Sequence, residues 1–156
     1  DRMKDHQDII DLLPYTDPFL FVDEIQSINE NEITGLYRIK QDEYFFKGHF
    51  PGNPVVPGVI LIEIMAQIGL VSFGISLLKA NAANQKKKYP VFTSSKVDFL
   101  DIVKPGDQLK VHSKKLYFRF NKLKCSVECE NITTGKVVCR GEMDGLILNE
   151  DVIERK

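Results

Sequence analysis

Two side chains, His49 and Glu63, have the types and surroundings that acid–base chemistry requires. His49 lies in a segment rich in Pro and Gly, and histidine is the residue type that most often accepts a proton in enzyme catalysis. Glu63 lies in an apolar run with no Lys or Arg beside it, so burial should raise the pKa of its carboxyl and favour the protonated acid. A base and a protonated acid placed together could catalyse an elimination.

Two further residues could support that chemistry. Gly58 follows Pro57 at the expected start of a helix, where backbone N–H groups are free and the helix dipole is positive. A substrate carbonyl could approach its N–H closely because Gly58 has no side chain, which makes it a candidate oxyanion hole. Gln67 follows Glu63 by one helical turn and could donate a hydrogen bond to it. Structural roles explain all four residues too, so residue types and spacing leave both interpretations open.

The acid must be positioned by the segment 59–79, which is apolar on almost every face and predicts a buried helix. Pro57 suits the entry to such a helix. A transmembrane span is the alternative, but Glu63 and Gln67 leave an uninterrupted apolar run shorter than the ~18 to 20 residues that a bilayer needs. We therefore expect a helix surrounded by the rest of a soluble protein.

The remaining elements are expected to form an antiparallel sheet around that helix. A short amphipathic helix, whose apolar residues including Leu12 share one face, precedes residues 44–58, an ordered loop whose Phe45, Phe46 and Phe50 should pack against the core. Alternating patterns and turn residues predict the helix at 8–13 and strands at 19–25, 33–39, 91–100, 108–120, 122–129 and 137–148. The prediction is one α+β domain over 1–156, in which the sheet leaves part of the helix for a second subunit to cover.

Composition excludes several classes of protein. The 156 residues carry 21 basic and 22 acidic side chains, a formal net charge of −1, so no global field attracts nucleic acid. The three cysteines, Cys125, Cys129 and Cys139, cannot form a disulfide framework, and no secretory signal opens the chain, which favours the cytoplasm. Buried thiols are preferred for them over a zinc site completed by His112.

A longer motif connects these residues to a known family. The run Gly48–Ile60, with Glu63 and Ala66–Gln67, matches G-H-F-P-x-x-P-x-x-P-G-V-[LI]-x-x-E-x-x-A-Q without a gap. This pattern resembles the signature of the hotdog-fold 3-hydroxyacyl-acyl-carrier-protein dehydratases of fatty acid synthesis. Flanking segments at 13–23 and 103–109 agree, and the resemblance extends from about Ile9 to Leu148.

The resemblance implies both a fold and a reaction. The fold is a long central helix wrapped by a curved antiparallel sheet, which dimerises through the sheet. The family's dimer places the His of one subunit opposite the Glu of the other. By position, His49 would remove the C2 proton, Glu63 would protonate the leaving C3 hydroxyl, and the Gly58 N–H would hold the thioester carbonyl. The product would be a trans-2-enoyl thioester, formed without a metal or another cofactor.

Related activities remain as alternatives. The dehydratase/isomerase branch typically has Asp where this chain has Glu63, which favours dehydration without isomerisation. Hotdog thioesterases generally lack the combined His loop and Glu helix. The same dehydration in a specialised polyene or polyketide-like pathway, and a non-catalytic acyl-binding subunit, are further alternatives. The chain departs from the family pattern at Tyr15–Thr16, usually His-Arg, and at Asp98–Asp101, where the family tends to be basic.

The resemblance also implies an acidic acyl carrier protein as partner, with the substrate on its phosphopantetheine arm. Such a partner would need a basic rim on a homodimer or larger oligomer. Candidates for the rim are Lys86, Lys87 and Lys88, together with Lys114, Lys115, Arg119, Lys122 and Lys124. Candidates for the walls of an acyl tunnel are Phe46, Phe50, Phe92 and Phe99.

Overall fold

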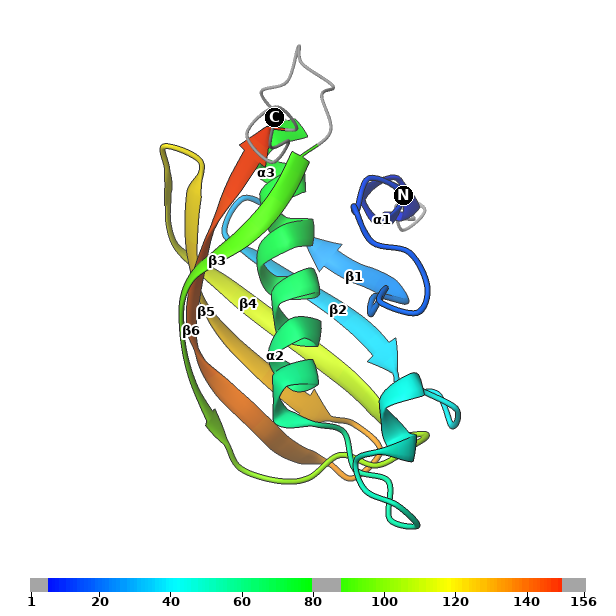
Figure 1. The fold of residues 1–156 in the computed structure, drawn as a ribbon. Coiled ribbons are helices and arrows are strands. Elements are labelled where there is room, and N and C mark those ends of the chain that lie inside the picture. The colour runs from blue at the N-terminus through cyan, green and yellow to red at the C-terminus, as the bar shows by residue number, and fades with distance from the viewer. Residues whose placement is uncertain (1–5, 80–87, 150–156) are drawn as a thin grey trace.

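A six-stranded antiparallel sheet curves around one long helix (Figure 1), in a computed structural model that describes residues 6–79 and 88–149. The strand order is β1-β2-β4-β5-β6-β3, so β1 and β3 form the two edges. The strands are β1 (Glu24–Ile28), β2 (Glu32–Arg38), β3 (Lys88–Phe99), β4 (Gln108–Arg119), β5 (Lys122–Asn131) and β6 (Lys136–Asn149). This arrangement confirms the predicted α+β fold, a helix wrapped by a curved antiparallel sheet.

The central helix runs without a break from Gly58 to Lys79. It consists of α2 (Gly58–Ala66), the π-helical turn η2 (Gln67–Ser72) and α3 (Phe73–Lys79). The Ser72 hydroxyl donates to the Gln67 carbonyl at 2.7 Å, and the Ser113 hydroxyl of β4 donates to the Gly69 carbonyl at 2.9 Å. These bonds satisfy carbonyls of the wider turn, which hydrophobic periodicity did not predict.

A single chain buries most of this helix, and the expectation that a second subunit covers the rest stays a prediction. Its most apolar stretch is long enough to cross a membrane, but 78% of that stretch is buried inside the protein, as in the core helix of a globular domain. Val59, 72% exposed, is an exception. Further exposed apolar side chains, those of Val91, Phe92 and Phe99, lie on the edge strand β3.

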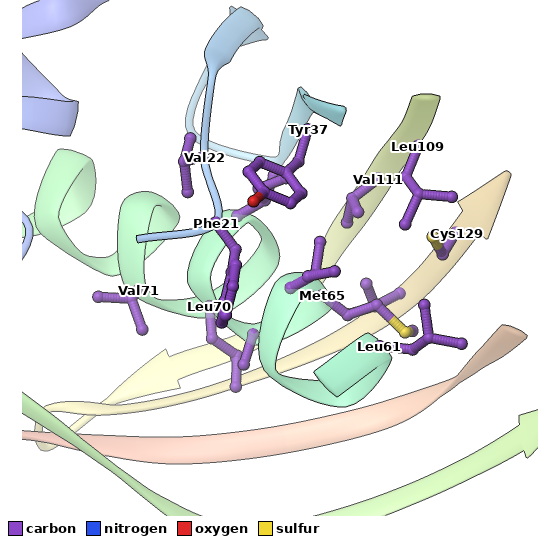
Figure 2. Close-up of a cluster of buried hydrophobic side chains, with 14 of the residues drawn as sticks. Phe21, Val22, Tyr37, Leu61, Met65, Leu70, Val71, Leu109, Val111 and Cys129 are labelled. Carbon is purple, nitrogen blue, oxygen red and sulfur yellow. The ribbon is translucent and has the colours of Figure 1, made fainter. Parts of the chain in front are cut away.

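The core joins the N-terminal segment, the helix and the sheet. Figure 2 shows Phe21 and Tyr37 on one side of the helix residue Met65, with Val111 of β4 and Cys129 of β5 close by. Phe21 and Tyr37 form an edge-to-face aromatic pair with ring centroids 5.5 Å apart. All three cysteines are free and buried, which confirms the interpretation as buried thiols.

Two sequence predictions need correction, one for the N-terminal helix α1 and one for the loop that precedes the central helix. α1 (Gln7–Asp11) buries Ile9 and Ile10, but Leu12 is 52% exposed and does not share their face. In the loop before the central helix, Phe46 of the 3₁₀ turn η1 (Tyr44–Lys47) is buried, whereas Phe50 is 50% exposed and does not pack into the core. Within that loop only a short helical turn can form because Pro and Gly follow it.

Candidate active site

The Glu63 side chain is held by Gln67, one helical turn further along. Glu63 Oε2 accepts a 2.9 Å hydrogen bond from Gln67 Nε2, and Gln67 is completely buried. The same Nε2 donates to the Phe19 carbonyl at 2.9 Å, and Gln67 Oε1 accepts the Phe21 N–H at 2.8 Å. Because backbone groups occupy the rest of the amide, Gln67 has one orientation and presents a donor to Glu63.

These bonds also explain why the first strand is shorter than predicted. The sequence pattern indicated a strand over 19–25, but β1 begins at Glu24. The Phe19 carbonyl and the Phe21 N–H bond to Gln67 instead of a neighbouring strand. Pairing starts only where the Asp23 N–H donates to the Leu36 carbonyl at 2.9 Å. Residues 19–21 therefore serve as a support for the helix residue that holds Glu63.

Glu63 lines an apolar cavity of about 170 Å³ between the helix and the β5, β6 and β3 end of the sheet. Its walls include Ala66, Leu70 and Val71 of the helix. The other lining residues are Tyr15, Phe19, Pro90, Val91, Phe92, Leu123, Gly145, Leu146 and Ile147. Glu63 is the one carboxylic acid among these described residues, so an apolar chain in the cavity would end beside a single acid.

Burial raises the pKa of Glu63 above its ordinary value, and the hydrogen bond from Gln67 partly offsets that rise. No cationic side chain of the described part of the chain forms an ion pair with Glu63. The carboxyl therefore has an environment that favours the protonated form and can supply a proton. This agrees with the electrostatic surroundings expected from the sequence.

His49 is oriented by its own loop. Its Nδ1 lies 2.8 Å from the Val55 carbonyl oxygen, and the Val55 N–H donates back to the His49 carbonyl at 3.1 Å. A carbonyl can only accept, so the proton of a neutral imidazole lies on Nδ1 and Nε2 is left as the basic nitrogen. The ring stacks on Phe50 with centroids 3.9 Å apart, and the side chain is partly exposed.

One chain does not bring His49 and Glu63 together. Among the described residues no hydrogen bond or ion pair joins them, and His49 is absent from the lining of the Glu63 cavity. Within the described part of one chain, His49 and Glu63 therefore do not line the same cavity.

Gly58 is the first residue of α2, so its N–H has no acceptor within the helix. A Cβ added at Gly58 would lie 3.1 Å from the Phe99 ring. Packing against Phe99 thus already explains the glycine, whereas the sequence suggested only room for a substrate carbonyl. The free N–H and the positive end of the helix dipole remain available at this position.

None of the described candidates for the basic rim lines the Glu63 cavity, although Lys122 is next to the lining residue Leu123 and pairs with the lining residue Leu146. Lys86 and Lys87 fall outside the described residues, and Lys88 Nζ donates to Asn149 Oδ1. At the β4–β5 hairpin the Arg119 guanidinium lies 4.6 Å from the centroid of the Tyr117 ring. Lys122 Nζ is 3.1 Å from Asp144 Oδ2. The hairpin is therefore basic, but Lys122 already has an acidic partner.

The four phenylalanines proposed as tunnel walls occupy different places. Phe92 of β3 lines the Glu63 cavity, whereas Phe46 is in the hydrophobic core. Phe50 stacks on His49, and Phe99 packs beside Gly58. The sequence missed two aromatic lining residues, Tyr15 and Phe19. Tyr15 could have been found as a departure from the family pattern immediately after Leu13–Pro14.

Solved structures with the same fold include several classes of protein. A dehydratase heterocomplex, ApeI:P of Xenorhabdus doucetiae, superposes with a TM-score of 0.76 at 16% identity, covering 94% of this chain and 97% of that chain. A hypothetical thioesterase of Streptococcus pneumoniae, solved with coenzyme A, gives a TM-score of 0.55 at 15% identity, covering 81% and 85%. At these identities the likeness is one of fold.

Sequence relatives are more specific. A 3-hydroxyacyl-[acyl-carrier-protein] dehydratase FabZ of Caldicellulosiruptor saccharolyticus is 38% identical over 145 residues, which cover 90% of this chain and 96% of that protein. The enzyme of the same name from Lactobacillus helveticus is 36% identical over 146 residues, covering 92% and 93%. Residues 13–142 match the FabA-like domain family. The chain belongs to the FabA-like family and, within it, groups with the FabZ dehydratases.

Proposed function

We propose that this chain is a (3R)-3-hydroxyacyl-[acyl-carrier-protein] dehydratase of fatty acid biosynthesis, a hydro-lyase that forms trans-2-enoyl thioesters. The observation that carries the proposal is the Glu63 carboxyl, held by Gln67 in an apolar cavity and favoured in its protonated form. The FabZ relatives, which match nearly the whole chain, support the same reaction.

The proposed chemistry divides the proton transfers between two residues. His49 Nε2, left free by the Nδ1 bond to Val55, removes the C2 proton of the thioester. Glu63 donates its proton to the C3 hydroxyl, which departs as water because hydroxide is a poor leaving group. The Gly58 N–H holds the thioester carbonyl oxygen while negative charge develops on it. The C2–H electron pair becomes the double bond and the C3–O pair leaves with the water, with no net oxidation or reduction, so the reaction calls for no redox cofactor.

The proposed active unit is a homodimer or a larger assembly of dimers. Among the described residues of one chain no hydrogen bond or ion pair joins His49 to Glu63, and His49 does not line the Glu63 cavity. His49 is therefore taken to face Glu63 of the partner subunit. The long edge strand β3, with its exposed apolar side chains, is the proposed contact between subunits. Each dimer would then contain two shared sites.

The proposed substrate arrives on the phosphopantetheine arm of an acidic acyl carrier protein. The basic β4–β5 hairpin, with Arg119 and Lys122, and the start of β3 at Lys88 are the proposed docking positions. Three free, buried thiols suit a reducing compartment, and we propose the cytoplasm.

The same dehydration in a specialised polyene or polyketide-like pathway is the second candidate. The observation that favours it is Tyr15, which departs from the family pattern and lines the Glu63 cavity, where it would meet the acyl chain. Assays with carrier proteins from fatty acid synthesis and from such pathways would separate the two candidates, because each predicts a higher kcat/KM with its own carrier.

The proposed reaction can be tested in reverse, as the hydration of crotonyl and longer enoyl thioesters. The loss of the enoyl absorbance measures this hydration. The wild-type protein should form the 3-hydroxyacyl thioester, and Glu63→Gln should lose that activity. Glu128→Gln, a change on the exposed side of β5, is the matched control and should remain active. Binding of the thioesters without any turnover by the wild-type protein would indicate a non-catalytic acyl-binding subunit instead.

A further inference from the structure

Tyr15 places a second polar group in the cavity that holds Glu63. The residue is half-buried, lines the cavity, and its ring contacts Phe19 with centroids 6.3 Å apart. The Phe19 carbonyl in turn accepts a hydrogen bond from Gln67 Nε2, which also donates to Glu63. Tyr15 therefore packs against a residue whose backbone belongs to the support of the acid.

The Tyr15 hydroxyl is close enough to Glu63 to be influenced by its charge. Burial first, and the negative charge of Glu63 second, raise the pKa of Tyr15 far above the ordinary value. The phenol therefore stays neutral over the pH range in which enzymes work. A neutral hydroxyl can both donate and accept a hydrogen bond but does not supply the proton of the reaction.

The Tyr15 hydroxyl has no hydrogen-bond partner among the described residues. Among the hydrogen bonds of the described residues, Glu63 accepts one from Gln67, and none joins Glu63 to Tyr15 or gives the Tyr15 hydroxyl a partner. No polar side-chain atom of these residues is both buried and unpaired, so the Tyr15 oxygen must remain accessible. Tyr15 and Glu63 thus line one apolar cavity without bonding to each other, so that both keep hydrogen-bonding capacity for a polar atom of a ligand in that cavity.

We propose that Tyr15 is a substrate-binding residue that, together with Glu63, holds the C3 hydroxyl of the 3-hydroxyacyl chain. This inference rests on the proposed function and names a recognition element that the sequence motif does not contain. Tyr15 donates a hydrogen bond to the C3 oxygen while Glu63 transfers its proton to that oxygen. The C3–O bond breaks, His49 Nε2 receives the C2 proton, and the departing water stays hydrogen-bonded to Tyr15.

Tyr15 would also provide chemical selectivity. The rest of the described cavity wall is largely apolar, so it holds saturated and hydroxylated chains by the same contacts. A hydroxyl between Tyr15 and Glu63 satisfies both polar groups, whereas a saturated chain leaves them unpaired in an apolar site. A loss of one such hydrogen bond corresponds to an affinity change of about two- to tenfold.

The test compares binding of 3-hydroxybutyryl- and butyryl-pantetheine by calorimetry. It is done in the His49→Asn background, where C2 deprotonation is blocked while Tyr15 and Glu63 are intact. Adding Tyr15→Phe should weaken binding of the hydroxylated thioester by about two- to tenfold and leave the saturated one unchanged. Tyr44→Phe, which alters an exposed tyrosine outside the cavity, is the control.

Equal effects of Tyr15→Phe on both thioesters, or no effect on either, would overturn the proposal. Thermal unfolding of each variant shows whether a uniform loss reflects damage to the fold. Because the readout is binding, it does not depend on turnover. The binding test could show that Tyr15 distinguishes the hydroxylated from the saturated thioester while the wild-type protein fails to hydrate enoyl thioesters. That result would contradict the proposed function but not the role of Tyr15 in binding.

Discussion

Gln67 donates to Glu63 through a side-chain amide that is itself fixed by the backbone of the segment preceding β1. The Phe19 carbonyl and the Phe21 N–H take the remaining bonds of that amide at 2.9 and 2.8 Å. The orientation of the acid thus depends on residues more than forty positions earlier in the chain, since both contacts bridge a sequence separation of 46 or 48. Such support is what keeps an active-site group in a productive geometry.

Replacement of Gln67 should affect stability and acid chemistry together. Gln67→Met leaves the buried Phe21 N–H without an acceptor, which should lower the free energy of unfolding by about 1–3 kcal/mol. It also removes the bond that lowers the pKa of Glu63, so this pKa should rise further. Urea unfolding and a pH–rate profile measure the two effects. Gln26→Met, at an exposed position of β1, should change neither. Unchanged activity in Gln67→Met would contradict the supporting role.

The raised pKa of Glu63 predicts how stability varies with pH. The folded chain holds this proton more tightly than the unfolded chain, whose ordinary value is 4.5. The stabilisation is therefore complete below that value and is lost as the pH rises through the folded pKa. Glu63→Gln does not titrate at this position, so its stability relative to the wild type should increase as the pH rises from 4.5 through the folded pKa of Glu63.

Urea unfolding at one fixed protein concentration measures that difference, because the stability of a dimer depends on concentration. Glu128→Gln should follow the wild-type pH dependence. A constant difference between Glu63→Gln and the wild type across this range would show that the Glu63 carboxyl has an ordinary pKa.

Two substitutions of His49 distinguish the roles of its two ring nitrogens. His49→Asn keeps a donor near the Nδ1 position for the Val55 carbonyl, whereas His49→Gln places its amide near the Nε2 position. If Nε2 is the base, both variants should lose about 100-fold or more in kcat, because an amide cannot accept the C2 proton. Only His49→Gln should also lower the thermal stability. An active His49→Asn enzyme would exclude Nε2 as the base.

Charge reversal at the hairpin tests the carrier-protein site. Arg119→Glu should raise KM for a substrate on its acyl carrier protein, since an acidic partner would be repelled. KM for the same acyl group on a small pantetheine thioester should not change. Lys136→Glu is the control. Lys136 begins β6, whereas Leu146, the residue of β6 that pairs with Lys122 of the hairpin, lies near the other end of that strand. Equal KM changes with both substrates would move the docking site elsewhere.

The sequence was sufficient for the fold because long-range features of the pattern left few alternatives. An all-round apolar helix needs a surrounding sheet, and four long alternating segments in the second half supplied it. The positive φ angles at Phe120 and Asn121 agree with the tight turn expected at Asn121. The length of β1 could not be predicted, because the bonds between Gln67 and residues 19–21 involve a side chain distant in sequence.

For the site, local chemistry could be predicted but distances could not. Glu63, Gln67 and the raised pKa followed from an acid in an apolar helix with an amide one turn away. The bond between His49 Nδ1 and Val55 depends on the loop conformation, and the entry of Tyr15 into the cavity depends on packing of the N-terminal segment. Neither leaves a periodic signal in the sequence.

Mixing two inactive variants tests the shared site most directly. His49→Asn and Glu63→Gln chains, co-expressed with different tags, form a mixed dimer with one site in which His49 and the partner's Glu63 are both intact. A random population should regain about a quarter of the wild-type hydration activity, since half of the dimers are mixed and each has one complete site. A purified mixed dimer as inactive as its parents would contradict a site made from His49 of one subunit and Glu63 of the other.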